Sequence, residues 1–195
     1  MALQQQVGPY SLGRMIEPPM VSEESRWRGI GTDLADVGER SAVAEFDDID
    51  RKLLKLLQDN DRRSLAELSG EIGAAQSTLN DRIKRLTANG VIGGFHARLA
   101  PEAVGLNLLA FVFVAWSDPK VEPAFLKKIR SSADVLECHH VTGAWNYLMK
   151  VRVGTTRDLE RFLAETIKSV SGMQRTETVI VLSSAKETWA LEPPK

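Results

Sequence analysis

Residues 64–90, SLAELSGEIGAAQSTLNDRIKRLTANG, decide the fold of the first half of the chain. Ser64 followed three residues later by Glu67 forms a capping box, which predicts a short helix that ends at Gly73. Apolar residues at helical spacing then predict a second helix over residues 76–88, and Asn89-Gly90 is typical of a helix end. Two helices joined by so short a turn predict a helix-turn-helix.

A further helix precedes this pair, and an extended segment follows it. Phe46, Leu53 and Leu57 share one helical face, and aspartates occupy the first turn, where the positive end of the helix dipole favours them. Residues 91–99, VIGGFHARL, are expected to form two strands joined at the glycine pair. Three helices and a strand pair together predict a winged helix-turn-helix domain over residues 46–100.

The pattern changes after Pro101. The expected order is strand, helix, strand, strand, helix and strand, at residues 108–115, 121–131, 135–141, 147–153, 156–170 and 176–183. This βαββαβ order predicts a ferredoxin-like domain over residues 107–190, after a linker over residues 101–106, and an α+β fold class. Two helices on one face leave the other face of the sheet bare. A second copy usually covers such a face, so we expect a homodimer.

Composition limits the classes of protein that remain. The 195 residues are 43 % hydrophobic and 26 % charged, which excludes a wholly disordered or collagen-like chain. No apolar run approaches the ~20 residues that span a bilayer, and the single cysteine cannot form an intramolecular disulfide. Residues 1–10 show no signal-peptide pattern. We therefore expect a cytoplasmic protein with no membrane partner, whose residues 1–45 are a disordered extension.

The second helix of the pair carries side chains suited to reading DNA. In the major groove, short hydrogen-bonding side chains meet base edges and basic side chains reach phosphates or guanines. The residues predicted to contact DNA are Gln76, Ser77, Thr78, Asn80, Arg82, Lys84 and Arg85, with Arg62 and Arg63 in the preceding turn. The alternative is an ordinary solvated face that pairs with Asp81. Residues 47–100 hold nine basic and eight acidic side chains, so DNA binding requires the positive charge to gather on one face.

These segments resemble one known family. DDIDRKLL at residues 47–54, RIKRL at 82–86 and ECHHVTGAWNYLMK at 137–150 are similar to motifs of the leucine-responsive regulator/AsnC (Lrp/AsnC, feast/famine) transcriptional regulators. The resemblance covers residues 46 to about 189. It implies transcription regulation by dimers that bind double-stranded DNA and assemble into octamers or other multimers under control of a small effector. Family members usually carry serine where Ala75 stands, and alanine cannot cap the recognition helix.

A glycine loop between two predicted strands is the candidate effector site. Gly143 permits a positive φ and exposes backbone N–H groups, which could hold a carboxylate together with the Thr142 hydroxyl. The resemblance implies that this loop lies between dimers and forms an amino-acid pocket, with an acidic residue where Asn146 stands. The predicted effector is therefore an amino acid or related amine, and the predicted contacts are Thr142, Gly143, Ala144, Trp145, Asn146 and Glu177.

An alternative reading of the same loop also stays open. The loop could be a plain hairpin turn in which Trp145 packs at an oligomer interface. Glu177 could then be an exposed carboxylate on an edge strand rather than the source of the negative charge that Asn146 lacks.

Metal binding and catalysis are not expected. Cys138 and His140 point to one side of their predicted strand and His139 to the other, and His96 is the one further histidine. The sequence contains no nucleophile elbow, P-loop or dinucleotide fingerprint. We therefore expect no cofactor, no metal and no enzyme activity. Two alternatives to a metabolite-responsive regulator remain: a nucleoid-organising DNA-binding protein without an effector, and a metabolite-binding protein whose helical domain docks a protein partner.

Overall fold

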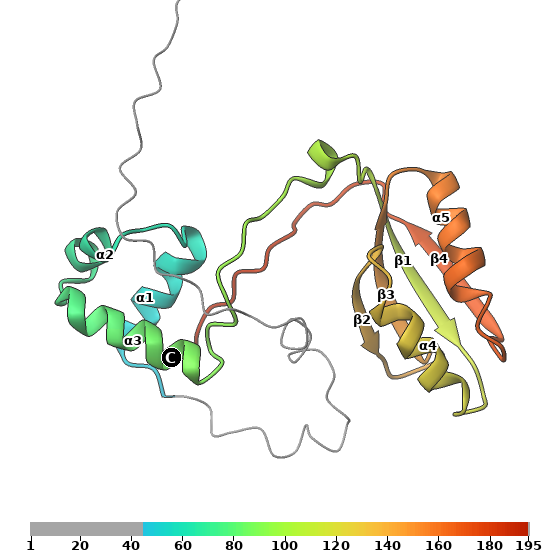
Figure 1. The fold of residues 1–195 in the computed structure, drawn as a ribbon, viewed down its shortest axis with the longest axis horizontal. Coiled ribbons are helices and arrows are strands. Elements are labelled where there is room, and N and C mark those ends of the chain that lie inside the picture. The colour runs from blue at the N-terminus through green and yellow to red at the C-terminus, as the bar shows by residue number, and fades with distance from the viewer. Residues whose placement is uncertain (1–44, 195) are drawn as a thin grey trace, which may run out of the picture. The chain divides into compact units, whose positions relative to one another are not determined.

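The computed structural model describes residues 45–194, so the extension predicted over residues 1–45 lies, apart from Glu45, outside the described residues. The chain divides into two compact units (Figure 1). Of the described residues, one unit contains 45–96 together with 188–194, and the other runs from Ala97 to Glu187. No helix within residues 45–194 is long and apolar enough to cross a membrane.

Three helices form the first unit. They are α1 (Asp48–Asp59), α2 (Leu65–Ile72) and α3 (Gln76–Ala88). The Asp47 carboxylate caps α1 by accepting the backbone N–H of Asp50 at 2.8 Å, and Ser64 and Glu67 form the predicted capping box of α2. The inward faces share one core: Leu53, Leu54, Leu57, Leu68, Leu79, Ile83 and Leu86. The predicted helix-turn-helix is confirmed.

A buried carboxylate joins α1 to α3. Asp50 is only 2 % exposed and accepts hydrogen bonds from Arg82 Nη1 at 2.9 Å and from Arg85 Nη2 at 2.6 Å. Arg82 also donates to Asp47 at 2.7 Å. The backbone N–H of Asp50 and the Arg82 guanidinium hold the pKa of Asp47 below its usual value. Both oxygens of the buried Asp50 carboxylate are thus paired, as a charge removed from water requires.

The prediction of a strand pair in the wing is wrong. Residues 91–99 form a short turn followed by chain without a strand ladder. The backbone N–H groups of Val91 and Ile92 both donate to Leu86 O, at 2.9 and 3.1 Å. The end of α3 therefore occupies two of the donors that a strand would need for a ladder.

The second unit is a four-stranded antiparallel sheet with helices. Its strands are β1 (Leu108–Ala115), β2 (Val135–His140), β3 (Tyr147–Val153) and β4 (Arg175–Ile180), and its α-helices are α4 (Val121–Arg130) and α5 (Thr156–Phe162). The strand order is β2-β3-β1-β4. This order and the alternation of strands and helices confirm the predicted ferredoxin-like βαββαβ domain and the α+β fold class.

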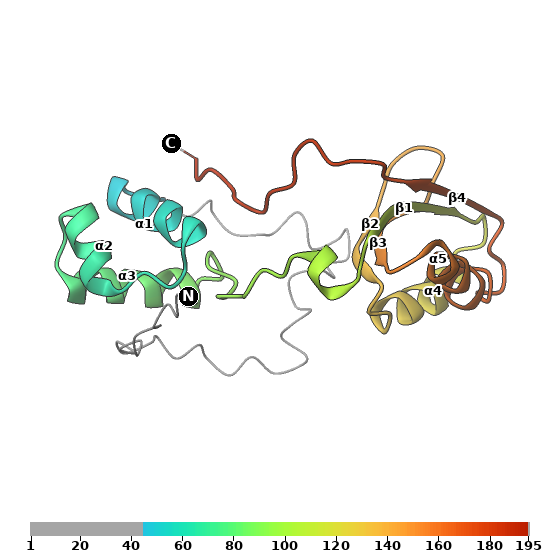
Figure 2. The same cartoon turned by 90° about the horizontal axis from the view of Figure 1, so that it is seen from above.

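Both α-helices cover the same face of this sheet (Figure 2). The core beneath them draws alternate residues from β1 and β3 and the inward residues of the helices: Ala110, Val112, Val114, Phe125, Tyr147, Met149, Val151, Leu159, Phe162 and Ile167. Because neighbouring residues of a strand point to opposite faces, Phe111 and Phe113 lie on the face that neither helix covers.

Apart from ends that differ by a single residue, three local features differ from the expected elements. A 3-10 helix, Pro101–Val104, occupies the predicted linker. The helix predicted over residues 156–170 is α-helical only to Phe162 and continues as a π-helix, Leu163–Ile167, after which the Lys168 N–H donates to Leu163 O at 2.8 Å. β4 ends at Ile180 instead of residue 183. These differences shift element ends and leave the topology unchanged.

The C-terminal segment, residues 188–194, packs on α1 within the first unit. The Gln58 side-chain amide donates to Leu191 O at 2.9 Å and accepts the Leu191 N–H at 2.7 Å. Arg51 Nε donates to Pro194 O at 2.9 Å. Just before this segment, in the second unit, Glu187 accepts a hydrogen bond from Lys150 Nζ at 2.7 Å, and that bond lowers the pKa of Glu187.

The buried Asp50 carboxylate gives a first test. Asp50→Asn keeps the side-chain shape but removes the charge that Arg82 and Arg85 share. We expect the free energy of unfolding to fall by about 2–4 kcal/mol, because disrupting a mostly buried ion pair is costly. Urea unfolding followed by far-ultraviolet circular dichroism measures it.

Asp48→Asn is the matched control for this test. Asp48 is exposed and pairs only with Arg51, its neighbour one turn along α1, among the described residues. We expect a change below about 0.5 kcal/mol, as for other exposed pairs. Equal, small effects of the two substitutions would contradict the structural importance of Asp50.

Candidate nucleic-acid interface and effector loop

The outer face of α3 is polar and open to solvent. Leu79, Ile83 and Leu86 point into the core, so the helix turns its remaining residues outward. The predicted base-reading residues Gln76, Ser77 and Thr78 are exposed in its first turn, and Asn80 is half-buried. The structure therefore brings these four side chains together at the N-terminal end of one helix.

The two arginines of α3 point toward α1. Arg82 and Arg85 pair with Asp50, and not with Asp81 as the sequence alternative had it. The hydrogen bonds that Arg82 donates to Asp50 and Asp47 raise the pKa of Arg82, which keeps its positive charge in place. Arg82 is 21 % exposed and Arg85 is 53 % exposed, so Arg85 alone retains much free surface. In this structure Arg82 holds α3 against α1.

The other basic residues predicted to contact DNA also differ in whether a carboxylate pairs with them. Arg63 is paired with Asp59 at 3.1 Å and with Glu71, and the hydrogen bond that Arg63 donates to Asp59 raises the pKa of Arg63. Arg62 and Lys84 are exposed and form no ion pair with any residue between 45 and 194. Of the basic residues predicted to contact DNA, these two present free charge to solvent.

Helix α3 starts without a side-chain cap. Ala75 occupies the cap position with φ −61° and ψ 142°, and no side chain accepts from the first N–H groups of the helix. Neither Gln76 nor Ser77 shifts the helix start to compensate. The positive end of α3 therefore opens beside Gln76 and Ser77, where an anion can approach the free N–H groups.

The glycine loop of the second unit, residues 142–145, is fixed at its two ends. The Val141 N–H donates to Asn146 O at 3.0 Å, and the Asn146 N–H donates to Val114 O at 2.9 Å. The Asn146 side-chain oxygen accepts the Trp116 N–H at 2.8 Å. Asn146 therefore joins the loop to the end of β1, which is a role that the sequence did not reveal.

Between these anchors the loop is open. Thr142, Gly143 and Ala144 are exposed, and Gly143 has the positive φ that was predicted, at +109°. No acceptor among residues 45–194 takes a hydrogen bond from the backbone N–H of these three residues. A run of free donors in a loop with positive φ can bind an anion.

An arginine that sequence reasoning missed lies over this loop's tryptophan. The Arg175 guanidinium carbon is 4.1 Å from the centre of the Trp145 ring, and the Phe113 ring centre is 5.7 Å from that of Trp145. Strand alternation could have identified this residue, because Arg175 and Glu177 lie at the start of β4 on the same face as Phe113. Glu177 lies 4.0 Å from Arg175.

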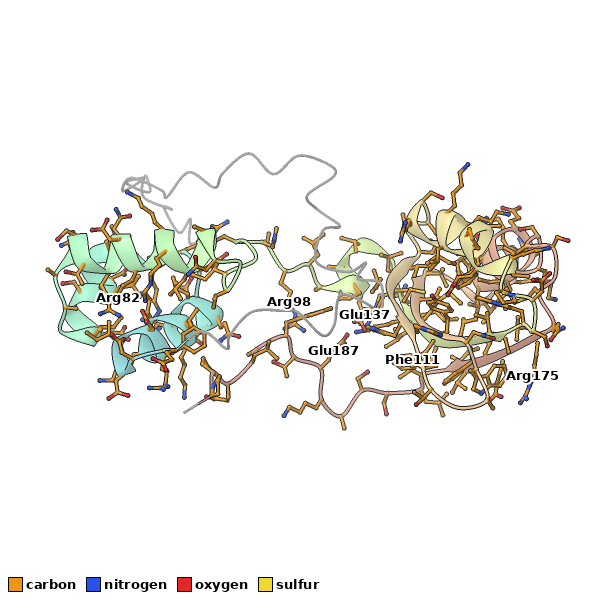
Figure 3. All side chains as sticks on the ribbon, turned by 90° about the horizontal axis from the view of Figure 1, so that it is seen from below. Arg82, Arg98, Phe111, Glu137, Arg175 and Glu187 are labelled. Carbon is orange, nitrogen blue, oxygen red and sulfur yellow. The ribbon has the colours of Figure 1, made fainter. Side chains whose placement is uncertain are left out.

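The uncovered face of the sheet is apolar at its centre and charged toward β2. Phe111 lies between Lys150 of β3 and Val179 of β4, and Phe113 lies between Leu148 and Glu177. Figure 3 shows Phe111 and Arg175 on the side of the sheet away from α4. Val179 is 45 % exposed, so large apolar side chains here lack cover from the described residues.

The cysteine and histidines of β2 form no metal centre with their surroundings. No group of three or more His, Cys, Asp or Glu side chains within the described range could hold a metal ion. His140 stacks on Tyr147 with ring centres 4.9 Å apart, and the Tyr147 hydroxyl donates to Glu122 at 2.6 Å. Burial raises the pKa of the Cys138 thiol to about 11, which keeps it protonated near neutrality.

The chain matches two domain families. Residues 46–92 match the winged helix-turn-helix DNA-binding family, and residues 109–191 match the Lrp/AsnC ligand binding domain. Among curated proteins, a proline dehydrogenase transcriptional activator from Rhizobium radiobacter is 37 % identical over 146 residues, covering 74 % of this chain and 94 % of the relative. A leucine-responsive regulatory protein from Haemophilus influenzae is 33 % identical, covering 77 % of this chain and 92 % of the relative.

Solved structures show the same architecture. A transcriptional regulator from Neisseria meningitidis, in complex with L-Met, superposes with a TM-score of 0.72 at 30 % identity, covering 75 % of this chain and 96 % of that one. AsnC from E. coli superposes with a TM-score of 0.72 at 27 % identity, covering 77 % of this chain and all of the other. The similarity therefore extends over both units and across nearly the whole length of these proteins.

The uncapped start of α3 yields a stability prediction. Ala75→Ser places an acceptor at a position that already has cap geometry. We expect the free energy of unfolding to rise by about 1 kcal/mol, the usual gain of a serine cap over alanine. Ala88→Ser, the same change at the other end of α3, is the control and should not stabilise. Urea unfolding measures both variants. If Ala75→Ser stabilises the protein no more than Ala88→Ser does, the first N–H groups of α3 are not in need of a cap.

Proposed function

This chain belongs to the Lrp/AsnC family of transcriptional regulators, and from that premise we propose how its residues bind DNA and sense a metabolite. The protein is a DNA-binding regulator that responds to a small molecule. The observation that carries the proposal is the attachment of α3: Asp50 pairs with two of its arginines, and the first turn of the helix presents Gln76, Ser77 and Thr78 to solvent. Our proposal includes no catalytic step.

In the proposed complex α3 lies in the major groove. Gln76, Ser77, Thr78 and Asn80 read base edges, because they occupy the N-terminal end of the recognition helix. Lys84 and Arg62 contact phosphates, and the free surface of Arg85 adds a further cationic contact. Arg82 and Arg63 act as positioning residues, since their guanidinium groups are engaged by carboxylates of the same unit.

Dimers form, in this proposal, through the uncovered face of the sheet. Phe111, Phe113, Leu148 and Val179 provide apolar surface, and a second copy that packs there removes it from water. A dimer places two helix-turn-helix units on one duplex. Its operator is then a pseudo-palindrome with half-sites one helical turn apart or a multiple of it. Larger assemblies of dimers contain more helix-turn-helix units.

The effector binds at residues 142–146 and β4. The open N–H donors of Thr142, Gly143 and Ala144 support the placement, and the complex of the Neisseria relative with L-Met supports an amino acid as the effector. Binding there changes how dimers associate and so changes the number of helix-turn-helix units that bind one DNA molecule. Stabilisation by an amino acid or related compound in a thermal-shift screen separates this regulator from a nucleoid-organising protein without an effector.

DNA binding is tested with Lys84→Ala and Arg62→Ala. Each removes one phosphate contact, so we expect weaker binding to the protein's own promoter region and a salt dependence reduced by about one in its logarithmic slope. Fluorescence anisotropy over a range of KCl concentrations measures both. Lys52→Ala, an exposed lysine of α1, is the control and should leave both unchanged. A protein that docks a partner through these helices would show no salt-steep DNA affinity at all.

The dimer is tested with Val179→Asp. A charge introduced on the uncovered sheet face lacks a partner in the interface, so we expect the dimer dissociation constant to rise at least about tenfold. Sedimentation velocity measures the species present, and circular dichroism checks that the variant is folded. Ala124→Asp, on the solvent side of α4, is the control. Unchanged assembly of a folded Val179→Asp protein would place the interface elsewhere.

A further inference from the structure

We propose that a groove between α1 and α2 binds a segment of this chain's own N-terminal extension, residues 33–39 (DLADVGE). This interaction goes beyond DNA binding and effector sensing and depends on neither. Four observations lead to it: the apolar floor of the groove, its free positive charge, the composition of the segment, and the short length of chain that joins the segment to α1.

The groove has a volume of about 310 Å³. It is lined by Lys52, Lys55, Leu56 and Asp59 of α1 and by Glu71 and Ile72 of α2. The two apolar residues, Leu56 and Ile72, are half-buried and pack against the core of the first unit. Apolar side chains that enter the groove would therefore extend this core and remove more apolar surface from water.

The groove faces away from α3. An α-helix has about 3.6 residues per turn, so Lys52 and Asp59 lie on roughly the opposite side of α1 from Asp50. Asp50 is the residue that pairs with the arginines of α3. A segment bound in the groove therefore leaves the exposed first turn of α3 free to contact DNA.

The groove carries free positive charge. Its two carboxylates, Asp59 and Glu71, are both paired with Arg63. Lys52 is exposed and forms no ion pair with a described residue. Among these residues Lys55 forms one ion pair, 3.9 Å long and largely exposed, with the C-terminal segment, and such pairs are weak. The groove is therefore complementary in charge to an acidic segment.

Residues 33–39 have the composition that this groove requires. They contain three carboxylates, no basic residue, and the apolar Leu34 and Val37 three positions apart. The other acidic stretch of the extension, residues 15–25, contains two prolines and lies farther from α1 in the chain. The helix-turn-helix match begins at residue 46, so residues 33–39 are an addition to that domain.

The connecting chain is long enough to reach the groove. Residues 40–44 precede the described range, and an extended chain covers about 3.4 Å per residue, so they span about 17 Å. The rise of about 1.5 Å per residue places Lys52 about 6 Å and Asp59 about 17 Å from the first residue of α1. So short a tether gives the segment an effective concentration of about a millimolar at the groove, which makes a weak attraction sufficient.

Carbodiimide cross-linking of the full chain tests this contact. The reagent joins a carboxylate to a lysine amine, with loss of water, where the two groups are in contact. We expect cross-links from the carboxylates of residues 33–39 to Lys52 or Lys55, identified by mass spectrometry after digestion. Lys84 of α3 is the matched control, because it is also exposed and unpaired within residues 45–194. Its yield with the same carboxylates should be at least about tenfold lower.

Charge reversal tests the electrostatic attraction. Lys52→Glu combined with Lys55→Glu should speed hydrogen–deuterium exchange in residues 33–39 at least about threefold, because the reversed groove repels the segment. Changing the three carboxylates of the segment to lysine as well should restore the slow exchange. Lys84→Glu is the control and should leave the exchange unchanged. Circular dichroism checks that each variant is folded.

A mixture of unlabelled and isotope-labelled protein identifies the chain that supplies the segment. We expect each cross-linked pair to carry a single label, because the segment binds the groove of its own chain. Pairs with mixed labels would show that a second copy is the occupant and would overturn the proposal. It is also overturned by equal cross-link yields at Lys52, Lys55 and Lys84, by no cross-links to the groove, or by cross-links from residues 15–25 instead. Exchange in residues 33–39 that is unchanged in the charge-reversed protein contradicts it as well.

Discussion

Asp50 is a negative charge that is nearly removed from water, and the geometry of the DNA-binding unit follows from what it needs. A buried carboxylate must find donors for both oxygens. It finds them in Arg82 and Arg85, two positions three residues apart on α3, which fixes the rotation of α3 about its own axis against α1. That rotation turns Gln76, Ser77 and Thr78 outward. The leucine core sets how closely the helices approach, and the ion pairs set which face of α3 meets a partner.

Local signals were sufficient for most of the elements. The capping box at Ser64 and Glu67 and the limits of α3 depend on neighbouring residues, so the sequence alone predicted them. The order of strands and helices after Pro101 was likewise predicted from local patterns. The predicted strand pair of the wing was wrong because the backbone N–H groups of Val91 and Ile92 donate to the end of α3. An extended sequence pattern does not reveal that these donors are already used.

The candidate sites were harder to predict, since their contacts join residues far apart in the chain. Arg82 was expected to point to DNA, and its partner Asp50 lies 32 residues earlier. Asn146 was expected to face a ligand, whereas its oxygen binds the backbone of Trp116, 30 residues away. Arg175 reaches Trp145 only because β4 pairs with β1 beside the loop. Composition and spacing identify the residue types, and strand pairing decides which of them meet.

The attachment of the C-terminal segment has a consequence for how this protein can be handled and how it can vary. Gln58 holds Leu191 through main-chain atoms, Arg51 holds the carbonyl of Pro194, and Lys55 lies 3.9 Å from the Glu192 carboxylate, so α1 contacts both the backbone and a side chain of that segment. Substitutions of Leu191 keep its two main-chain bonds to Gln58 as long as the backbone can reach α1. A fusion partner or purification tag joined directly after residue 194 would therefore act on the first helix of the DNA-binding unit.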